Sequence, residues 1–138
     1  MKQFAKDQIP VAVKIWIKNQ DAAKHKYGDI SRWNTSNVTD MKNLFSYTTN
    51  FNYDISEWDT SNVKNMSHMF FTAKNVYSDL RNWDTSNVTD MSGMFLKTTN
   101  FNGNLSNWDT SNVTNMEGMF SRATNLNGNF TNWDKRFF

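Results

Sequence analysis

The stretch Trp83-Asp84-Thr85-Ser86-Asn87-Val88-Thr89-Asp90-Met91-Ser92-Gly93-Met94-Phe95 decides the fold, because near copies of it occur four times along the chain. Each copy begins with a tryptophan, and a fifth tryptophan follows the last copy at the same interval of 25 residues. These tryptophans are Trp33, Trp58, Trp83, Trp108 and Trp133. An interval of this length, kept without insertion or deletion, indicates units that stack on one another and bury one continuous core.

Large apolar residues recur at fixed places within each unit. Those that follow the tryptophan of the first unit are Val38, Met41, Leu44 and Phe45. Their spacing matches one face of a short helical turn. Residues 55–60 and their copies are rich in residues that favour strands, so the copies are expected to pair in parallel. The sequence therefore predicts an α/β repeat solenoid, with one short parallel β-strand and one short helical turn in each 25-residue coil.

The residues before the first unit carry the pattern of an N-terminal helical cap. A helix is expected from about Pro10 to Lys18, followed by a break and a second short helix that Gly28 ends. The apolar face of this cap consists of Ile9, Ala12, Val13, Trp16 and Ala23. Such a cap covers the apolar end of the first coil. The predicted organisation is residues 1–29 as the cap and residues 30–138 as a single solenoid domain of four repeats and the start of a fifth.

Polar positions recur as regularly as the apolar ones. The tryptophan column is interpreted as core, and the alternative is an exposed ladder that stacks on a ligand. Asn37 and its copies Asn62, Asn87 and Asn112 are predicted to form a buried ladder that satisfies backbone groups at turns. Asp59 and its copies are interpreted as turn-forming side chains rather than calcium ligands, because Asn34 replaces them in the first unit.

Composition restricts the classes of function. Lys plus Arg number 15 against 13 for Asp plus Glu. The sequence contains no basic stripe, so nucleic-acid binding is not predicted. The chain has no cysteine, which excludes disulfides and thiolate metal sites. His25 and His68 do not recur and accompany no nucleophile or metal spacing, so no enzyme, cofactor or metal site is predicted. Residues 1–8 lack the apolar run of a signal peptide or membrane span, which predicts a cytoplasmic protein without membrane insertion.

Recognition is expected where one position varies while its neighbours stay constant. The second unit and its flanks are the least regular and the most aromatic part of the chain. The candidate protein-contact residues are therefore Tyr53, Phe71 and Tyr77, together with Arg32 and Glu57. The alternative is that these side chains vary on a solvated surface that binds nothing.

Three functions are consistent with this pattern. The first is a non-enzymatic module that presents an interaction or adhesion surface to an unidentified protein partner. The second is assembly into a homo-oligomer through Trp133, Phe137 and Phe138, because the fifth unit stops shortly after its tryptophan. The third is ice or carbohydrate binding by a threonine array, which requires the hydroxyl groups to face outward. That array consists of Thr35, Thr60, Thr85 and Thr110.

The string from Trp83 to Phe95 resembles the 25-residue repeat of mycoplasma-type surface lipoproteins, which belongs to the wider BspA-like group of leucine-rich-repeat surface proteins. The similarity covers residues 30–134, and the residues from Trp16 to Gly28 resemble the helical lead-in of such repeats. The resemblance implies a leucine-rich-repeat-like solenoid, with a strand near residues 105–108 and a helical turn near residues 113–120. It also implies a surface or adhesion protein of unknown ligand, although the chain shows no lipobox or wall anchor.

Overall fold

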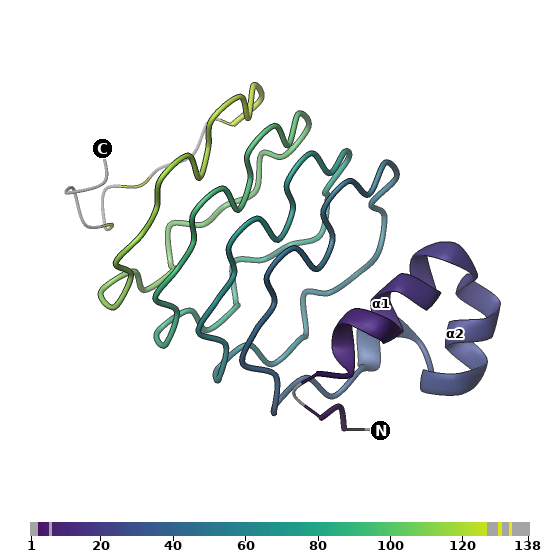
Figure 1. The fold of residues 1–138 in the computed structure, drawn as a ribbon. Helices are drawn as coiled ribbons and strands as arrows, with labels where there is room; N and C mark the ends of the chain where they lie inside the picture. Colours follow the sequence, from purple (N-terminus) through teal and green to yellow (C-terminus); the bar gives the residue numbers. More distant parts are fainter. Residues whose placement is uncertain (1–2, 6, 127–129, 131–132, 134–138) are drawn as a thin grey trace.

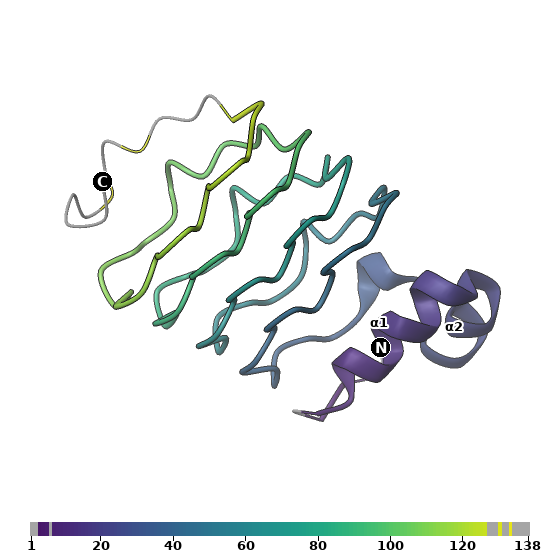
Figure 2. The same ribbon diagram turned by 45° about the horizontal axis from the view of Figure 1, so that its top comes forward.

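The computed structural model describes residues 3–5, 7–126, 130 and 133. Two helices lie at one end of a row of stacked coils (Figure 1). The coils follow one another in register along a single axis, as the turned view shows (Figure 2). We number the coils by the tryptophans that begin them, from Trp33 in the first to Trp108 in the fourth.

The N-terminal cap consists of helix α1 (Ile9–Lys18), helix α2 (Gln20–Tyr27) and a short 3₁₀ turn, η1 (Ile30–Arg32). Asn19 separates the two α-helices, and its side-chain oxygen accepts a hydrogen bond from the N–H of Ala22 at 3.1 Å, as an N-cap does. Gly28 ends α2 with a φ of 80°, a conformation that favours glycine. The predicted helix from about Pro10 to Lys18, the break and the stop at Gly28 are confirmed.

The predicted apolar face of the cap is buried, since Ile9, Ala12, Val13, Trp16 and Ala23 are each at most 2% exposed. The ring of Trp16 meets the ring of Trp33 edge to face, with 5.8 Å between centroids. The two α-helices therefore cover the first coil, as Figure 1 shows.

The predicted α/β solenoid, with a strand and a helical turn in each coil, is wrong. The described part of the coils contains isolated parallel bridges, such as Asp40 with Asn65, and neither a strand nor an α-helix. The predicted strand at residues 55–60 is interrupted by a turn, in which the N–H of Trp58 donates to the carbonyl of Ile55 at 3.2 Å. This turn also directs both side chains into the core, which a straight strand cannot do.

The predicted helical turn is replaced by a series of tight turns with alternating hydrogen bonds. The N–H groups of Met41, Asn43, Phe45 and Tyr47 donate to carbonyls 24 residues later, in the second coil, at 2.8–3.0 Å. Between them, the N–H groups of Leu44 and Ser46 donate to carbonyls three residues earlier in their own coil, and that of Lys42 donates to the carboxylate of Asp40. Asn43 and Tyr47 have φ values of 59° and 63°, as the third residue of a type II turn requires and a helix forbids. We call residues 41–50, 66–75, 91–100 and 116–125 the turn face.

The tryptophan column forms the core of the coils, which confirms the structural interpretation. The five ring systems are 2–4% exposed, and Trp83 stacks parallel to Trp108 at 6.3 Å. From Trp58 onward, each indole N–H donates to the carbonyl 28 residues earlier, as Trp83 does to Ile55 at 3.0 Å. That carbonyl also accepts the N–H of Trp58, so one acceptor closes a turn and joins two coils.

The threonine column points into the core. Thr35, Thr60, Thr85 and Thr110 are 0–4% exposed. The hydroxyl groups of the first three donate to backbone carbonyls of the next coil at 2.9–3.0 Å. The array therefore does not meet the condition for ice or carbohydrate binding, which required outward-facing hydroxyl groups.

The asparagine ladder exists, but its predicted burial is wrong. The side-chain N–H groups of Asn62, Asn87 and Asn112 donate to carbonyls of the preceding coil at 2.7 Å, and all three residues are exposed. The turn-forming role predicted for the column after tryptophan is confirmed at positions 34, 59, 84 and 109, and Asp134 lies outside the described residues. The carboxylate of Asp59 accepts hydrogen bonds from the N–H and hydroxyl of Ser61, and Asn34 does the same with Ser36 in the first coil.

These turns predict a loss of stability in acid. Hydrogen bonds from the serine hydroxyl lower the pKa of Asp54, Asp59 and Asp109, the Ser31 N–H lowers that of Asp29, and the Arg81 side chain that of Asp79. A carboxyl group whose pKa is lower in the folded state stabilises the fold above its unfolded pKa and loses that contribution as pH falls. The urea midpoint should therefore be constant near neutral pH and fall below about pH 4.

Urea unfolding at several pH values measures this effect. The variant Ser56→Ala/Ser61→Ala removes the hydroxyl donors to Asp54 and Asp59 but keeps the N–H donors, so its urea midpoint should change less between neutral pH and about pH 3. A wild-type midpoint that rises toward acid would contradict the prediction.

Candidate functional site

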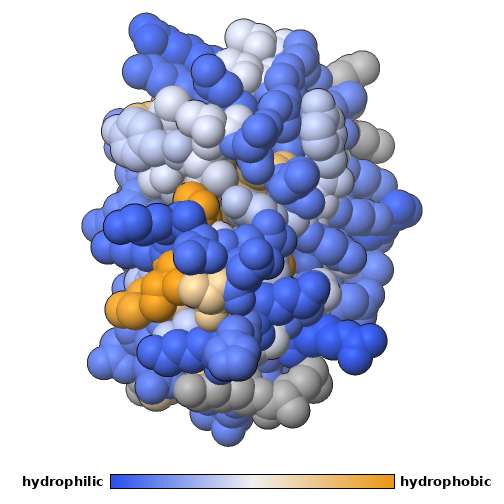
Figure 3. All heavy atoms as spheres, turned by 90° about the vertical axis from the view of Figure 1, so that its right-hand side faces the viewer, coloured by the Kyte–Doolittle hydropathy of each residue, from blue (hydrophilic) through white to orange (hydrophobic). Residues whose placement is uncertain are grey.

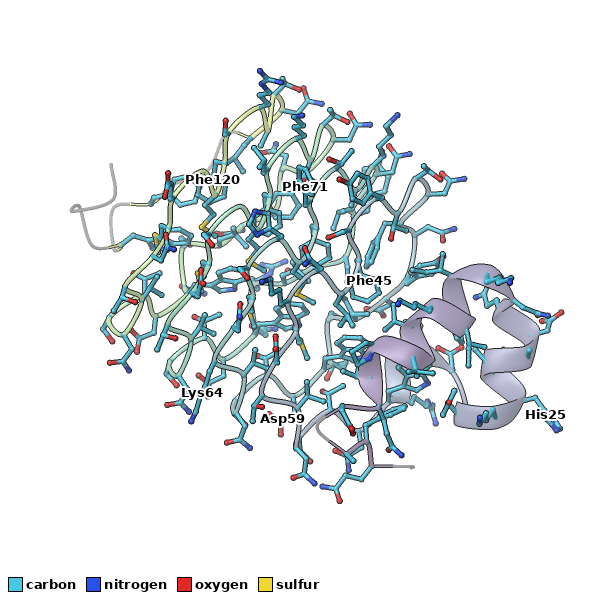
Figure 4. The ribbon with its side chains drawn as sticks, in the orientation of Figure 1. His25, Phe45, Asp59, Lys64, Phe71 and Phe120 are labelled. Atoms are coloured by element: carbon cyan, nitrogen blue, oxygen red, sulfur yellow. The ribbon has the colours of Figure 1, made fainter. Side chains whose placement is uncertain are left out.

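The five predicted contact residues do not form one patch. Phe71 lies on the turn face, in an open groove of about 540 Å³. Tyr53 and Tyr77 line a second hollow of about 360 Å³, and Arg32 and Glu57 line a third of about 550 Å³ beside Trp33. Figure 4 shows Phe71 high on the coils and Asp59, which borders the third hollow, at their lower edge.

Tyr53 holds the cap against the first coil. Its ring meets that of Trp16 edge to face at 6.0 Å and that of Phe51 at 5.2 Å. Burial raises the pKa of its hydroxyl, as expected for a phenol packed against a core. Tyr77 is different, because it is 72% exposed and stands between the second hollow and a further one of about 320 Å³. The structure thus gives Tyr53 a packing role and leaves Tyr77 on the surface.

The groove around Phe71 contains three aromatic side chains from two coils. The ring of Tyr47 meets Phe71 edge to face at 5.1 Å, and the imidazole of His68 meets it at 5.7 Å. Tyr47 is 65% exposed, whereas Phe71 and His68 are half-buried. We call Tyr47, His68 and Phe71 the aromatic groove. The other residues that line it are Lys42, Asn43, Ser46, Ser67, Asp90 and Ser92.

The backbone of the turn face holds these side chains in place. Tyr47 and His68 both have positive φ values, 63° and 55°, which are uncommon for residues other than glycine. The His68 ring lies directly over Gly93, where an added Cβ would come within 2.5 Å of Nε2. The hydroxyl of Ser46 donates to the carbonyl of His68 at 2.8 Å and ties the two coils together beside the groove.

The sequence identified Phe71 but did not combine it with Tyr47 and His68. Both of the missed residues stand in variable columns, since Tyr47 corresponds to Thr72 and Lys97, and His68 to Gly93. The signal that could have found them is an aromatic ring in a column where the other coils have glycine or a non-aromatic polar residue.

The groove offers contact surface rather than a converging set of reactive groups. Figure 4 shows His25 on the outer side of α2, far from the labelled Phe71. Among the described residues, no group of three or more His, Cys, Asp and Glu side chains has a geometry that could hold a metal ion. The carboxylate of Asp90 accepts hydrogen bonds from the N–H and hydroxyl of Ser92.

The other surfaces are more polar. Figure 3 faces the cap and shows a small apolar area within a largely hydrophilic surface. Val11 and Ile17 of α1 are 55% and 41% exposed. In the part of the chain that the structure describes, no helix has the length and apolar character needed to cross a membrane.

The predicted self-association edge is only partly within the described residues. Trp133 is 3% exposed and stacks on Trp108 at 6.3 Å, so it belongs to the core. Phe137 and Phe138 lie outside the described residues.

Comparison with known proteins gives a family but no characterised relative. No curated protein and no solved structure gives a significant match. Residues 16–133 match the model of a family described as "Mycoplasma protein of unknown function, DUF285". The match begins within α1 and ends at the last tryptophan, so it includes all four coils. The chain therefore belongs to the DUF285 family of mycoplasma proteins of unknown function.

Proposed function

We propose that the protein is a non-enzymatic interaction module that binds a protein partner through the aromatic groove. The observation that carries this proposal is the ring of Tyr47, which is 65% exposed and meets the ring of Phe71 in the next coil at 5.1 Å. The positive φ of Tyr47 recurs at Thr72, Lys97 and Arg122 in the same column, so it belongs to the turn and places the side chain on the surface. Aromatic side chains are also the residues on which binding energy at protein interfaces is concentrated.

The replacement Tyr47→Asn tests whether Tyr47 has a packing role. Asparagine tolerates a positive φ better than tyrosine, and the mostly exposed ring loses only its contact with Phe71. The free energy of unfolding should therefore stay within about 0.5 kcal/mol of the wild-type value. Urea unfolding measures it, and a loss above about 2 kcal/mol would make Tyr47 a structural residue instead.

Peptide selection on the immobilised protein tests the proposed function. The variant Tyr47→Asn/Phe71→Ser removes two rings of the groove, and serine already occupies the Phe71 column at Ser46 and Ser121. Peptides selected on the wild type should bind this variant about tenfold more weakly and should bind Tyr77→Asn unchanged. If none of the selected peptides depends on the groove, the proposal is wrong.

Self-association is a second candidate, favoured by N–H groups of the fourth coil that lack an acceptor. The N–H groups of Met116, Gly118, Phe120 and Arg122 correspond to those that join the earlier coils. Among the described residues, these four groups have no acceptor. Unpaired backbone donors of this kind can pair with a second chain.

The molecular mass as a function of concentration, measured by sedimentation, tests this candidate. A mass that rises with concentration would support assembly through the fourth coil, particularly if Phe137→Asp/Phe138→Asp abolished the rise. A constant mass would exclude this route and leave the groove as the candidate surface.

The finer relationship to BspA-like surface proteins is also a proposal. It is supported by the string from Trp83 to Phe95, which resembles the repeat of that group. Under this proposal the partner is a protein met at the cell surface. Surface labelling of intact cells that produce the full-length protein would test the location.

A further inference from the structure

Charge is unevenly distributed around the coils. The turn face holds four lysine or arginine side chains against one glutamate, a formal net charge of +3. The remaining coil residues, 30–40, 51–65, 76–90 and 101–115, hold three basic against eight acidic side chains, a net charge of −5. The basic residues of the turn face are Lys42, Lys74, Lys97 and Arg122. The nearly neutral composition of the whole chain thus conceals a basic face beside acidic ones.

The basic side chains of the turn face are available to a partner. All four are exposed. The ion pairs found within the described residues are Lys24 with Asp29 and Arg81 with Asp79, neither of which involves the turn face. Exposed cations without an intramolecular partner raise the local potential and attract anionic groups during encounter.

Lys42 borders the aromatic groove, and Lys97 lies on the next coil along the stack. Lys42 lines the groove itself, and Lys97 follows Leu96, which is half-buried in the column of Phe71. One anionic residue, Asp90, also lines the groove, and its carboxylate keeps its negative charge because its hydrogen-bond donors, the N–H and hydroxyl of Ser92, are neutral. The lining of the groove therefore carries one charge of each sign beside its aromatic rings, and the surplus of positive charge lies on the surrounding turn face.

We propose that the aromatic groove binds an extended acidic segment of a protein partner. An aromatic or aliphatic side chain of this segment packs against Tyr47 and Phe71, and flanking carboxylates pair with Lys42 and Lys97. The inference rests on the proposed function, because it names the chemistry of the partner that the same groove receives. Opposite charge then guides the approach of the segment, and the rings supply most of the affinity.

Three synthetic peptides of equal length test the charge preference by calorimetry. Each has a central phenylalanine, flanked by glutamate and aspartate in the first peptide, serine and asparagine in the second, and lysine and arginine in the third. The acidic peptide should bind at least about tenfold more tightly than the neutral one at low salt. Its affinity should fall when salt is raised from about 50 to about 300 mM, because exposed charges are then screened.

Matched variants can be taken from the repeat itself. Lys42→Ser and Lys97→Thr introduce the residues found at Ser67 and Thr72 in the same columns, so the coils should still fold. The double variant should bind the acidic peptide about tenfold more weakly and the neutral peptide unchanged. Lys64→Ser, which removes a cation from outside the turn face, should leave both affinities unchanged.

The outcomes separate this inference from the proposed function. If the neutral and acidic peptides bind with equal affinity, the charge preference is overturned. If the variant Tyr47→Asn/Phe71→Ser still loses that binding, the groove remains a protein-binding site. Binding of peptides that neither groove rings nor cations affect would overturn both proposals. Tighter binding of a single-stranded thymidine oligonucleotide of equal charge, dependent on the same rings, would replace the acidic segment by nucleic acid.

Discussion

Replacing Trp83 by alanine is expected to lower the free energy of unfolding by about 4 kcal/mol. The indole is 4% exposed and stacks on Trp108 at 6.3 Å, so its removal leaves a cavity between neighbouring coils. The replacement also removes the hydrogen bond from the indole N–H to the carbonyl of Ile55. That carbonyl keeps its bond from the N–H of Trp58, so the lost hydrogen bond should contribute about 1 kcal/mol.

Urea unfolding of two variants separates the cavity from the hydrogen bond. Trp83→Phe keeps an aromatic ring in the stack but cannot donate to Ile55. It should therefore lower the free energy of unfolding by clearly less than Trp83→Ala does. Tyr77→Ala removes a ring that is 72% exposed and should change the stability by less than about 0.5 kcal/mol. A loss below about 1.5 kcal/mol for Trp83→Ala would contradict a core role for this column.

The sequence predicted the cap and most of the core residues because burial leaves a periodic trace. Trp58, Val63, Met66, Met69 and Phe70 are each at most 3% exposed, and each recurs at the interval of 25 residues. The cap was predictable for a local reason, since Asn19 and Gly28 are residues that begin and end helices by their own chemistry.

The predictions of a strand and a helical turn were wrong because the same spacing of apolar residues fits more than one backbone conformation. Met41, Leu44 and Phe45 have helical spacing, but the N–H groups of Met41 and Phe45 donate to the next coil. Their neighbour Asn43 has a φ of 59°, which no helix contains. Which carbonyl an N–H group selects depends on the neighbouring coil, and the sequence of one unit does not contain that information.

The aromatic groove was incompletely predicted for a geometric reason. Comparison of columns aligns residues 25 apart, so Tyr47 is compared with Thr72. The hydrogen bonds that the N–H groups of Met41, Asn43, Phe45 and Tyr47 make to the second coil join residues 24 apart, so Tyr47 is bonded to the carbonyl of Phe71. This offset of one residue sets the two rings side by side. The neighbours on a surface of stacked coils are therefore found by the hydrogen-bond register rather than by the sequence period.

Replacing Phe4 by alanine is expected to lower the free energy of unfolding by about 3 kcal/mol, although no repeat or helical pattern assigns this residue to the core. Phe4 precedes the first helix, and its side chain is fully buried. Its ring contacts Trp33 at 5.1 Å and Tyr27 at 5.5 Å, while its N–H donates to the carbonyl of Asn34 at 3.3 Å. Phe4 thus joins the N-terminal segment to both α2 and the first tryptophan of the stack.

Phe4 makes its contacts at one end of the stack. Its replacement should therefore destabilise the cap more than the distant coils, in addition to lowering the stability of the whole fold. Amide hydrogen exchange in Phe4→Ala should increase more in α1 and α2 than in the third coil, since the coils keep their own hydrogen bonds. Val11→Ala serves as the control, because Val11 lies on α1 but is 55% exposed. If Phe4→Ala costs less than about 1 kcal/mol, or if exchange rises equally in every coil, the N-terminal segment is not what holds the cap to the first coil.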